Sequence, residues 1–331
     1  MELKHLWQFL SFNLSTALSF LRLQFSGMPN LSAIFVTFID AMLSLHFLLC
    51  SMSPCTIDLD DQTTLHFWVT NRRQFNRPNL VLIHGYGGNS RWQFLNQVRP
   101  LSKSFNLYIP DLLFFGDSYT NRTDRSDIFQ AKCAREGLKK LGVEKYNVVG
   151  ISYGGYVAYY MAENFNDEVK KVVIVSCGIC YTEEQREEQL RKLGRNNNIY
   201  DLLVPRKPED AREMLKLAMH KIKPTKWLPD SVICEFINVI ANNHRKEKLE
   251  LVDHLMAKRA DKKLPILTQE TLLIWGDQDS VFPVQLAYQL QRHLGPKSRV
   301  EIIKDTGHAA NIESADAVNS LITSFVCGGQ S

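Results

Sequence analysis

Short apolar runs alternate with longer helical patterns from about residue 63 to the end of the chain. The apolar runs are rich in β-branched and aromatic residues, and they predict strands over 64–69, 79–83, 106–109, 146–150, 171–176, 271–275 and 299–303. Strands that alternate with helices are typical of a mostly parallel sheet with helices on both faces. We therefore expect an α/β fold built on a central sheet of about eight strands.

This alternation stops for about ninety residues between the strand that ends near Ser176 and the strand that begins at Thr271. A structureless loop of such length is uncommon inside a compact domain. The segment instead carries helical patterns over 183–193, 208–221, 230–242 and 246–259. We expect residues 178–268 to form a helical cap, or lid, inserted into an α/β core made of residues 56–177 and 269–328.

The N-terminal part of the chain has a different pattern. Residues 3–26 place apolar side chains at helical spacing opposite a polar face made mostly of serine. Such an amphipathic helix either lies in a membrane interface or packs on the protein's own surface, and the pattern leaves both open. Residues 31–50 are apolar enough to approach a membrane span, but Asp40 near the centre would cost roughly 2.5 to 3.5 kcal/mol there. We expect residues 1–55 to be helical and residues 1–50 to bind the cytosolic face of a membrane peripherally.

Charge and cysteine content narrow the possible partners and compartment. The 331 residues have a formal net charge of +4, and the basic residues are interspersed with acidic ones, so a nucleic-acid partner is not expected. The seven cysteines lack the even, dense spacing of a disulfide scaffold, which favours a reducing, cytoplasmic compartment. Cys177 and Cys180 form a C-x-x-C, but they follow an apolar strand without further metal ligands and fit a packing role.

The most informative motif is Gly150-Ile151-Ser152-Tyr153-Gly154, which lies between a predicted strand and the helical run 156–164. In this context the serine occupies a sharp, strained turn that pushes its hydroxyl above the sheet, and glycines are needed because larger side chains would clash. The sequence therefore predicts Ser152 as a nucleophile.

A serine nucleophile needs a base, and the base needs a group that fixes its tautomer. His308 follows the predicted strand 299–303 directly, at the edge of the sheet where a base belongs. Two aspartates, Asp277 and Asp279, follow the strand 271–275. We favour Asp279 as the acid that orients His308, because Asp277 is better placed to cap the tight turn.

Two backbone N–H groups are candidates to hold the oxyanion that forms in acyl transfer. Tyr153 follows the nucleophile, and Tyr86 lies in the loop His84-Gly85-Tyr86-Gly87-Gly88 after the strand 79–83. His84 itself fits a loop-organising hydrogen bond better than a catalytic base.

Together with the Phe115-Gly116-Asp117-Ser118 segment and Gly307-His308, these motifs make residues 56–327 resemble a capped α/β-hydrolase, of the type that includes monoacylglycerol lipases, esterases and C–C hydrolases. The resemblance implies a mechanism without cofactor or metal, and a serine at position 152 implies an acyl intermediate. We expect hydrolysis of a small hydrophobic carboxylic ester. Two alternatives remain open, namely C–C hydrolysis of a diketone-like substrate and a ligand receptor built on the hydrolase fold.

Overall fold

The computed structural model describes residues 31–192, 199–223, 228–257 and 264–328. Its centre is a nine-stranded sheet with the order β1-β2-β4-β3-β6-β7-β8-β9, to which β5 is added by pairing with β2. The strands are β1 (Met52–Asp58), β2 (Thr63–Thr70), β3 (Asn79–Ile83), β4 (Asn106–Pro110), β5 (Tyr119–Thr120), β6 (Tyr146–Ile151), β7 (Val169–Val175), β8 (Glu270–Gly276) and β9 (Ser298–Ile303).

The sheet is mixed but mostly parallel, which confirms the predicted fold class. The strands β4, β3, β6, β7, β8 and β9 pair in parallel, whereas β1, β4 and β5 are all antiparallel to β2. All seven predicted strands are present within about two residues of their expected ends. The strands β1 and β5 were not predicted, and they raise the number from about eight to nine.

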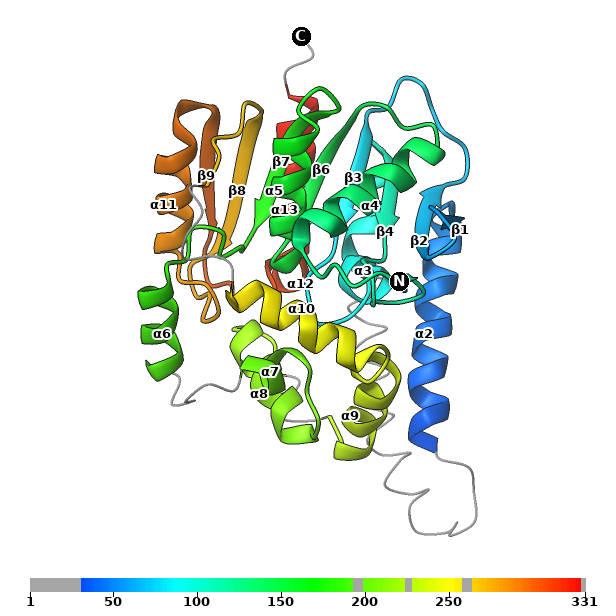
Figure 1. The fold of residues 1–331 in the computed structure, drawn as a ribbon, viewed down its shortest axis with the longest axis vertical. Coiled ribbons are helices and arrows are strands. Elements are labelled where there is room, and N and C mark those ends of the chain that lie inside the picture. Colours follow the sequence, from blue (N-terminus) through cyan, green and yellow to red (C-terminus); the bar gives the residue numbers. More distant parts are fainter. Residues whose placement is uncertain (1–30, 193–198, 224–227, 258–263, 329–331) are drawn as a thin grey trace.

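Helices cover both faces of this sheet (Figure 1). The helices α4 (Asp127–Lys140), α5 (Tyr153–Asn164) and α11 (Gln285–Leu294) pack on one face, and α3 (Ser90–Leu101) and α13 (Ala315–Cys327) pack on the other. The starts of α3 and α4 are fixed by capping residues in the sequence. The Asn89 side chain accepts a hydrogen bond from Trp92 N–H, and the Ser126 side chain accepts one from Phe129 N–H. Two shorter elements complete this part of the chain, namely the 3₁₀ turn η3 (Gly295–Lys297) and the helix α12 (Ala310–Glu313).

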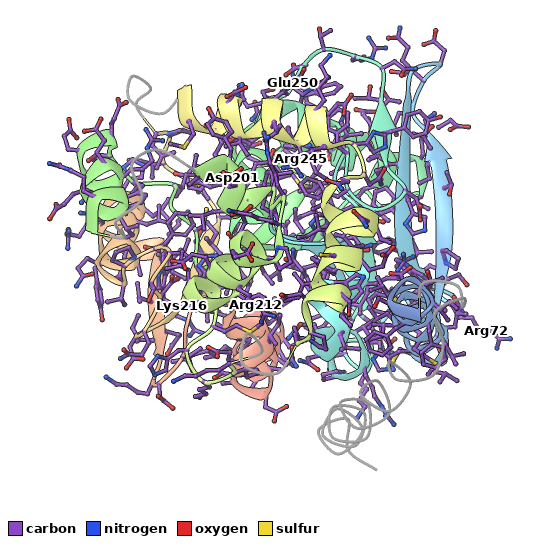
Figure 2. The ribbon with its side chains drawn as sticks, turned by 90° about the horizontal axis from the view of Figure 1, so that it is seen from below. Arg72, Asp201, Arg212, Lys216, Arg245 and Glu250 are labelled. Carbon is purple, nitrogen blue, oxygen red and sulfur yellow. The ribbon has the colours of Figure 1, made fainter. Side chains whose placement is uncertain are left out.

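A helical insertion joins β7 to β8 and lies beyond the carboxyl ends of the parallel strands (Figure 1). It contains α6 (Glu183–Lys192), α7 (Ile199–Leu203), α8 (Pro208–Ala218), α9 (Asp230–Phe236), the π-helical turn η2 (Ile237–Ala241) and α10 (Arg245–Ala257). All four predicted helices of the segment are present, and α7 is an addition. Glu250, labelled on α10 in Figure 2, accepts a hydrogen bond of 2.7 Å from Arg125 Nε, so an ion pair connects the insertion to the core.

The N-terminal helix α2 (Leu31–Leu49) runs along the β1 edge of the molecule and packs against α3 and α9. The predicted helical segment extended to residue 55, but the helix ends at Leu49 and β1 begins at Met52. The amphipathic helix predicted over residues 3–26 lies outside the described residues. Among the helices that the structure describes, none is long and apolar enough to cross a bilayer.

Candidate active site

Ser152 lies on the tight turn between β6 and α5. Its backbone has φ 53°, a conformation that non-glycine residues rarely adopt, so the turn is strained. The turn is also tightly packed, because a Cβ atom on Gly150 would lie 2.3 Å from the Gly154 carbonyl oxygen, and one on Gly154 would lie 2.3 Å from that of Ile83. Only glycines fit at these two positions, as the motif predicted.

His308 contacts both residues that the sequence placed with it. Its Nε2 lies 2.9 Å from Ser152 Oγ, and its Nδ1 lies 3.0 Å from Asp279 Oδ2. The three side chains follow β6, β8 and β9, whose carboxyl ends share one edge of the sheet. If the serine hydroxyl donates to Nε2, then Nδ1 carries the proton and donates to Asp279. A neutral imidazole in this tautomer can accept the hydroxyl proton.

The carboxylate of Asp279 is fixed on both of its oxygens. Oδ2 accepts from His308, while Oδ1 accepts from the backbone N–H groups of Val281 and Phe282 at 2.9 and 2.8 Å. The side chain is fully buried. Asp277 was expected to cap its own turn, but its side chain faces the loop after β9, where its Oδ1 accepts from Thr306 N–H at 3.4 Å. Of the two competing aspartates, the structure therefore brings Asp279 to His308.

The glycine-rich loop after β3 lies directly against Ser152, since a Cβ atom on Gly85 would be 3.1 Å from Ser152 Cβ. Gln93 of α3 holds this loop with two hydrogen bonds, because its Oε1 accepts from Gly85 N–H at 2.7 Å and its Nε2 donates to Gly85 O at 2.9 Å. Nothing in the sequence indicates this role for Gln93, because its position in the helical pattern does not differ from those of the other polar residues of α3.

His84 organises the same loop, as its position predicted. Its Nε2 accepts from Leu112 N–H at 2.9 Å, so its Nδ1 carries the proton and donates to Gly85 O at 2.7 Å. Complete burial lowers the pKa of His84, although the nearby Asp111 carboxylate opposes that change. His84 is therefore a neutral, structural histidine.

Tyr86 and Tyr153, the two predicted oxyanion residues, face each other with ring centroids 5.6 Å apart. The N–H of Tyr86 has no hydrogen-bond acceptor within the described part of the chain, and Tyr153 is the first residue of α5. The phenol of Tyr86 donates to the backbone oxygen of Lys248 in α10, and burial raises its pKa well above the usual value. This contact joins the loop to the helical insertion. The two residues are 162 positions apart in the chain, and no sequence pattern indicates that they meet.

The other titratable clusters fit structural roles. His66, Asp111 and Asp117 are the one set of three or more His, Cys, Asp or Glu residues, within the described part of the chain, whose potential metal-ligand atoms all lie within 4.8 Å of one another. His66 Nδ1 already bonds Asp111 Oδ2 at 3.0 Å, and Asp111 Oδ1 accepts from Ser90 N–H, so these groups connect β2, β4 and α3. All seven cysteines are unpaired, and burial raises the pKa of Cys180 to about 11, which disfavours a metal-binding thiolate.

Comparison with known proteins agrees with the observed fold. A family model described as alpha/beta hydrolase fold matches residues 78–215 and 229–315. Monoacylglycerol lipase ABHD6 of Mus musculus is 26% identical over 264 residues, which are 77% of each chain. A 2-hydroxy-6-oxononadienedioate/2-hydroxy-6-oxononatrienedioate hydrolase of Pseudomonas sp is 27% identical over 262 residues, 75% of this chain and 87% of the relative. The crystal structure of a bacterial membrane phospholipase A shares the fold, with a TM-score of 0.74, 22% identity and 98% of both chains covered.

Proposed function

Because the chain belongs to the α/β-hydrolase fold family, we propose that it is a serine hydrolase that cleaves a carboxylic ester through an acyl-enzyme intermediate. The observation that carries the proposal is the hydrogen-bonded series from Asp279 through His308 to Ser152, with distances of 3.0 and 2.9 Å. In this series a buried carboxylate fixes the imidazole, and the imidazole is in contact with the hydroxyl that it has to deprotonate.

In the first step, Ser152 Oγ attacks the ester carbonyl carbon while its proton passes to His308 Nε2. Asp279 stabilises the imidazolium that results. The carbonyl oxygen becomes an oxyanion, to which the N–H groups of Tyr86 and Tyr153 donate. The tetrahedral intermediate then expels the alcohol, which takes the proton from His308, and the acyl group stays on Ser152.

In the second step, water replaces the alcohol. His308 accepts a proton from the water as its oxygen attacks the acyl carbon, and the same two N–H groups hold the second oxyanion. When this intermediate collapses, Ser152 Oγ leaves with the proton from His308, the carboxylic acid is released, and the starting protonation state returns. The cycle consumes one water and needs no electron acceptor.

The substrate that we propose has a hydrophobic acyl or alcohol part. Beside the nucleophile, the Tyr86 ring lies 5.2 Å from the Phe115 ring and 5.6 Å from the Tyr153 ring, centroid to centroid. Phe282 packs edge-on to His308 at 5.4 Å. Aromatic surroundings favour an apolar group next to the reacting carbonyl. The name of the 26% identical relative, a monoacylglycerol lipase, is consistent with such a substrate. The helical insertion, acting as a cap, is the part we expect to select it.

C–C hydrolysis is the second candidate, because a relative named as a hydrolase of a dienedioate is 27% identical to this chain. The same serine and histidine would serve both reactions, so only substrates separate them. A panel of p-nitrophenyl esters of graded acyl length, assayed beside a vinylogous 1,5-diketone, makes the distinction. Turnover of the esters alone supports our proposal, whereas turnover of the diketone alone refutes it.

Labelling with a fluorophosphonate tests the nucleophile. The wild-type chain should be labelled, and Ser152→Ala should abolish labelling and lower kcat for an ester by a factor on the order of 10⁶. Ser176→Ala is the matched control, because Ser176 directly follows the neighbouring strand β7, is buried, and has an Oγ without a hydrogen-bond partner in the described structure. This control should be labelled like the wild type. Labelling that persists in Ser152→Ala would refute the assignment.

Acidification provides a separate test of the base. Because an imidazolium cannot accept the Ser152 proton, ester hydrolysis and labelling should fall together as His308 is protonated. Ester hydrolysis that keeps its full rate in acid while the protein stays folded would contradict the proposed role of His308.

A further inference from the structure

The helix α2 exposes a continuous row of large apolar side chains. They recur every three or four residues, except for an adjacent pair at the end of the helix, and such spacing places them on one face. We call this row the α2 stripe; its members and exposed fractions are Ile34 52%, Phe38 53%, Met42 42%, Leu45 43%, Leu48 48% and Leu49 76%. A helix on a water-facing surface usually has polar side chains there.

The carboxylate and the imidazole of α2 face the protein instead. Asp40, the one formally charged residue of the helix, accepts from Arg91 NH2 at 2.7 Å and from Trp92 Nε1 at 3.1 Å. His46 Nε2 lies 3.2 Å from Leu95 O, and burial lowers the pKa of His46, so its neutral form is favoured. Asp40 and His46 therefore find their hydrogen-bond partners in α3, and the large side chains on the outer face of α2 are apolar.

A second copy of the chain is a poor fit to this face. Together the six side chains expose about as much surface as three whole residues, on the order of 600 Å² if a large side chain presents roughly 200 Å². A patch of this size is at the upper end for a monomer. It is smaller than the roughly 800 Å² per partner of a stable interface. A bilayer needs no complementary shape and accepts a narrow apolar strip.

The loop of residues 71–76 lies beyond the C-terminal end of α2, because Asn71 N–H donates to Ser51 O at 3.0 Å. Phe75 in this loop is 98% exposed, and Arg72 and Arg73 are exposed beside it. Figure 2 shows the Arg72 side chain projecting from the edge of the molecule on the α2 side. Aromatic and basic residues next to an apolar helix face are typical of segments that bind an anionic membrane interface.

We propose that the α2 stripe and the loop of residues 71–76 dock on a lipid bilayer that contains anionic lipids, with α2 lying in the plane of the interface. The apolar side chains enter the boundary between headgroups and acyl chains, and the arginines contact anionic headgroups. Since α9 packs against α2, docking brings the helical insertion close to the bilayer surface. This proposal does not depend on the chemistry of Ser152.

Vesicle flotation of the full-length chain tests the proposal. The wild type should float with vesicles of phosphatidylcholine mixed with phosphatidylglycerol. The variant Phe38→Gln/Leu45→Gln/Leu49→Gln should bind at least tenfold more weakly, because it removes apolar area from the contact. The matched control is Ile266→Gln/Tyr288→Gln, which changes two side chains that are 65% and 44% exposed elsewhere on the molecule. This control should float like the wild type.

A second variant examines the electrostatic part. Arg72→Gln should weaken binding to the mixed vesicles by about fivefold and leave binding to pure phosphatidylcholine unchanged. Because the substitution is in an exposed loop, it also provides a test if the triple variant is not recovered folded.

Two outcomes would overturn the proposal. One is flotation of the triple variant that equals the wild type, which would place the membrane contact elsewhere in the chain. The other is no flotation of the wild type together with a concentration-dependent dimer that the triple variant loses, which would assign the stripe to a second copy. Fluorophosphonate labelling of Ser152 and hydrolysis of a short water-soluble ester should stay at wild-type level in all variants. A failure of docking is thereby distinguished from a failure of the proposed activity.

Discussion

Lys248 is a buried cation whose removal should stabilise the protein in a pH-dependent manner. The residue is 4% exposed, its Nζ donates to Ile240 O at 2.6 Å, and the ring of Phe115 lies 5.1 Å away. No acidic side chain forms an ion pair with it among the residues that the structure describes. Burial, with a further contribution from the positive charge of Arg245, lowers the pKa of Lys248 from 10.5 to about 8. The substitution that we consider is Lys248→Met, which keeps an unbranched side chain and removes the charge.

The magnitude follows from the difference between the two pKa values of Lys248. A decrease from 10.5 to about 8 corresponds to about 3 kcal/mol of unfavourable free energy for the charged form in the folded state. Below pH 8 the lysine is protonated in both states, and this penalty is fully present. As the pH rises above 8, the folded state releases its proton while the unfolded state still holds one. The free energy of unfolding therefore rises with pH, by about 1.4 kcal/mol between pH 7 and 9.

Urea unfolding followed by circular dichroism at pH 7, 8 and 9 measures this effect as a difference between two proteins. Buried thiols such as Cys133, whose pKa burial raises to about 12, lower stability at high pH, but they do so equally in both and cancel. Lys248→Met should be more stable than the wild type at pH 7, and its advantage should shrink by about 1.4 kcal/mol at pH 9. Lys246→Met is the control on the same helix, since its side chain is 84% exposed. A difference between Lys248→Met and wild type that stays constant from pH 7 to 9 would refute the reasoning.

Three other substitutions test separate parts of the structure. Asp279→Asn should lower kcat by a factor on the order of 10⁴, because an amide no longer fixes the His308 tautomer, whereas Asp277→Asn should stay near wild type in the same ester assay. Gly154→Ala places a Cβ 2.3 Å from a backbone oxygen and should lower the melting temperature and abolish fluorophosphonate labelling. Asp40→Ala removes the carboxylate that accepts from Arg91 and Trp92, and should reduce the urea-derived free energy of unfolding by about 1 to 3 kcal/mol.

The parallel strands β3, β4, β6, β7 and β8 could be predicted from the sequence because most of their residues are buried, so they appear as short apolar runs. Strand β1 could not, since it contains Pro54, ends in Asp58, and has only its first residue buried. It becomes a strand by pairing with β2 from Met52↔Thr70 to Asp58↔Thr64, and such pairing is a property of the folded chain. Strand β5 has two residues and gives no periodicity at all.

The candidate site was predictable to a similar extent. Ser152 and His308 each follow a recognisable strand in a motif with a local physical reason, so their convergence at one edge of the sheet could be inferred. The hydrogen bonds of Gln93 to Gly85 and of Tyr86 to Lys248 could not be inferred. Each hydrogen bond depends on how a helix packs against the loop. A helical pattern in the sequence shows which face of the helix is apolar, but it does not show which polar group that helix will contact.

The helix α2 shows why a single charge is a poor guide to the surroundings of an apolar segment. The penalty for Asp40 in a bilayer assumes that its carboxylate meets lipid. In the folded chain the carboxylate meets Arg91 and Trp92, while Phe38 and Leu45, on the opposite side, are exposed. The charge therefore opposes a span, in which the whole circumference would enter the bilayer, but it does not oppose docking of one face. Hydropathy summed along a segment cannot separate these two cases, because only the packing against α3 decides where the carboxylate points.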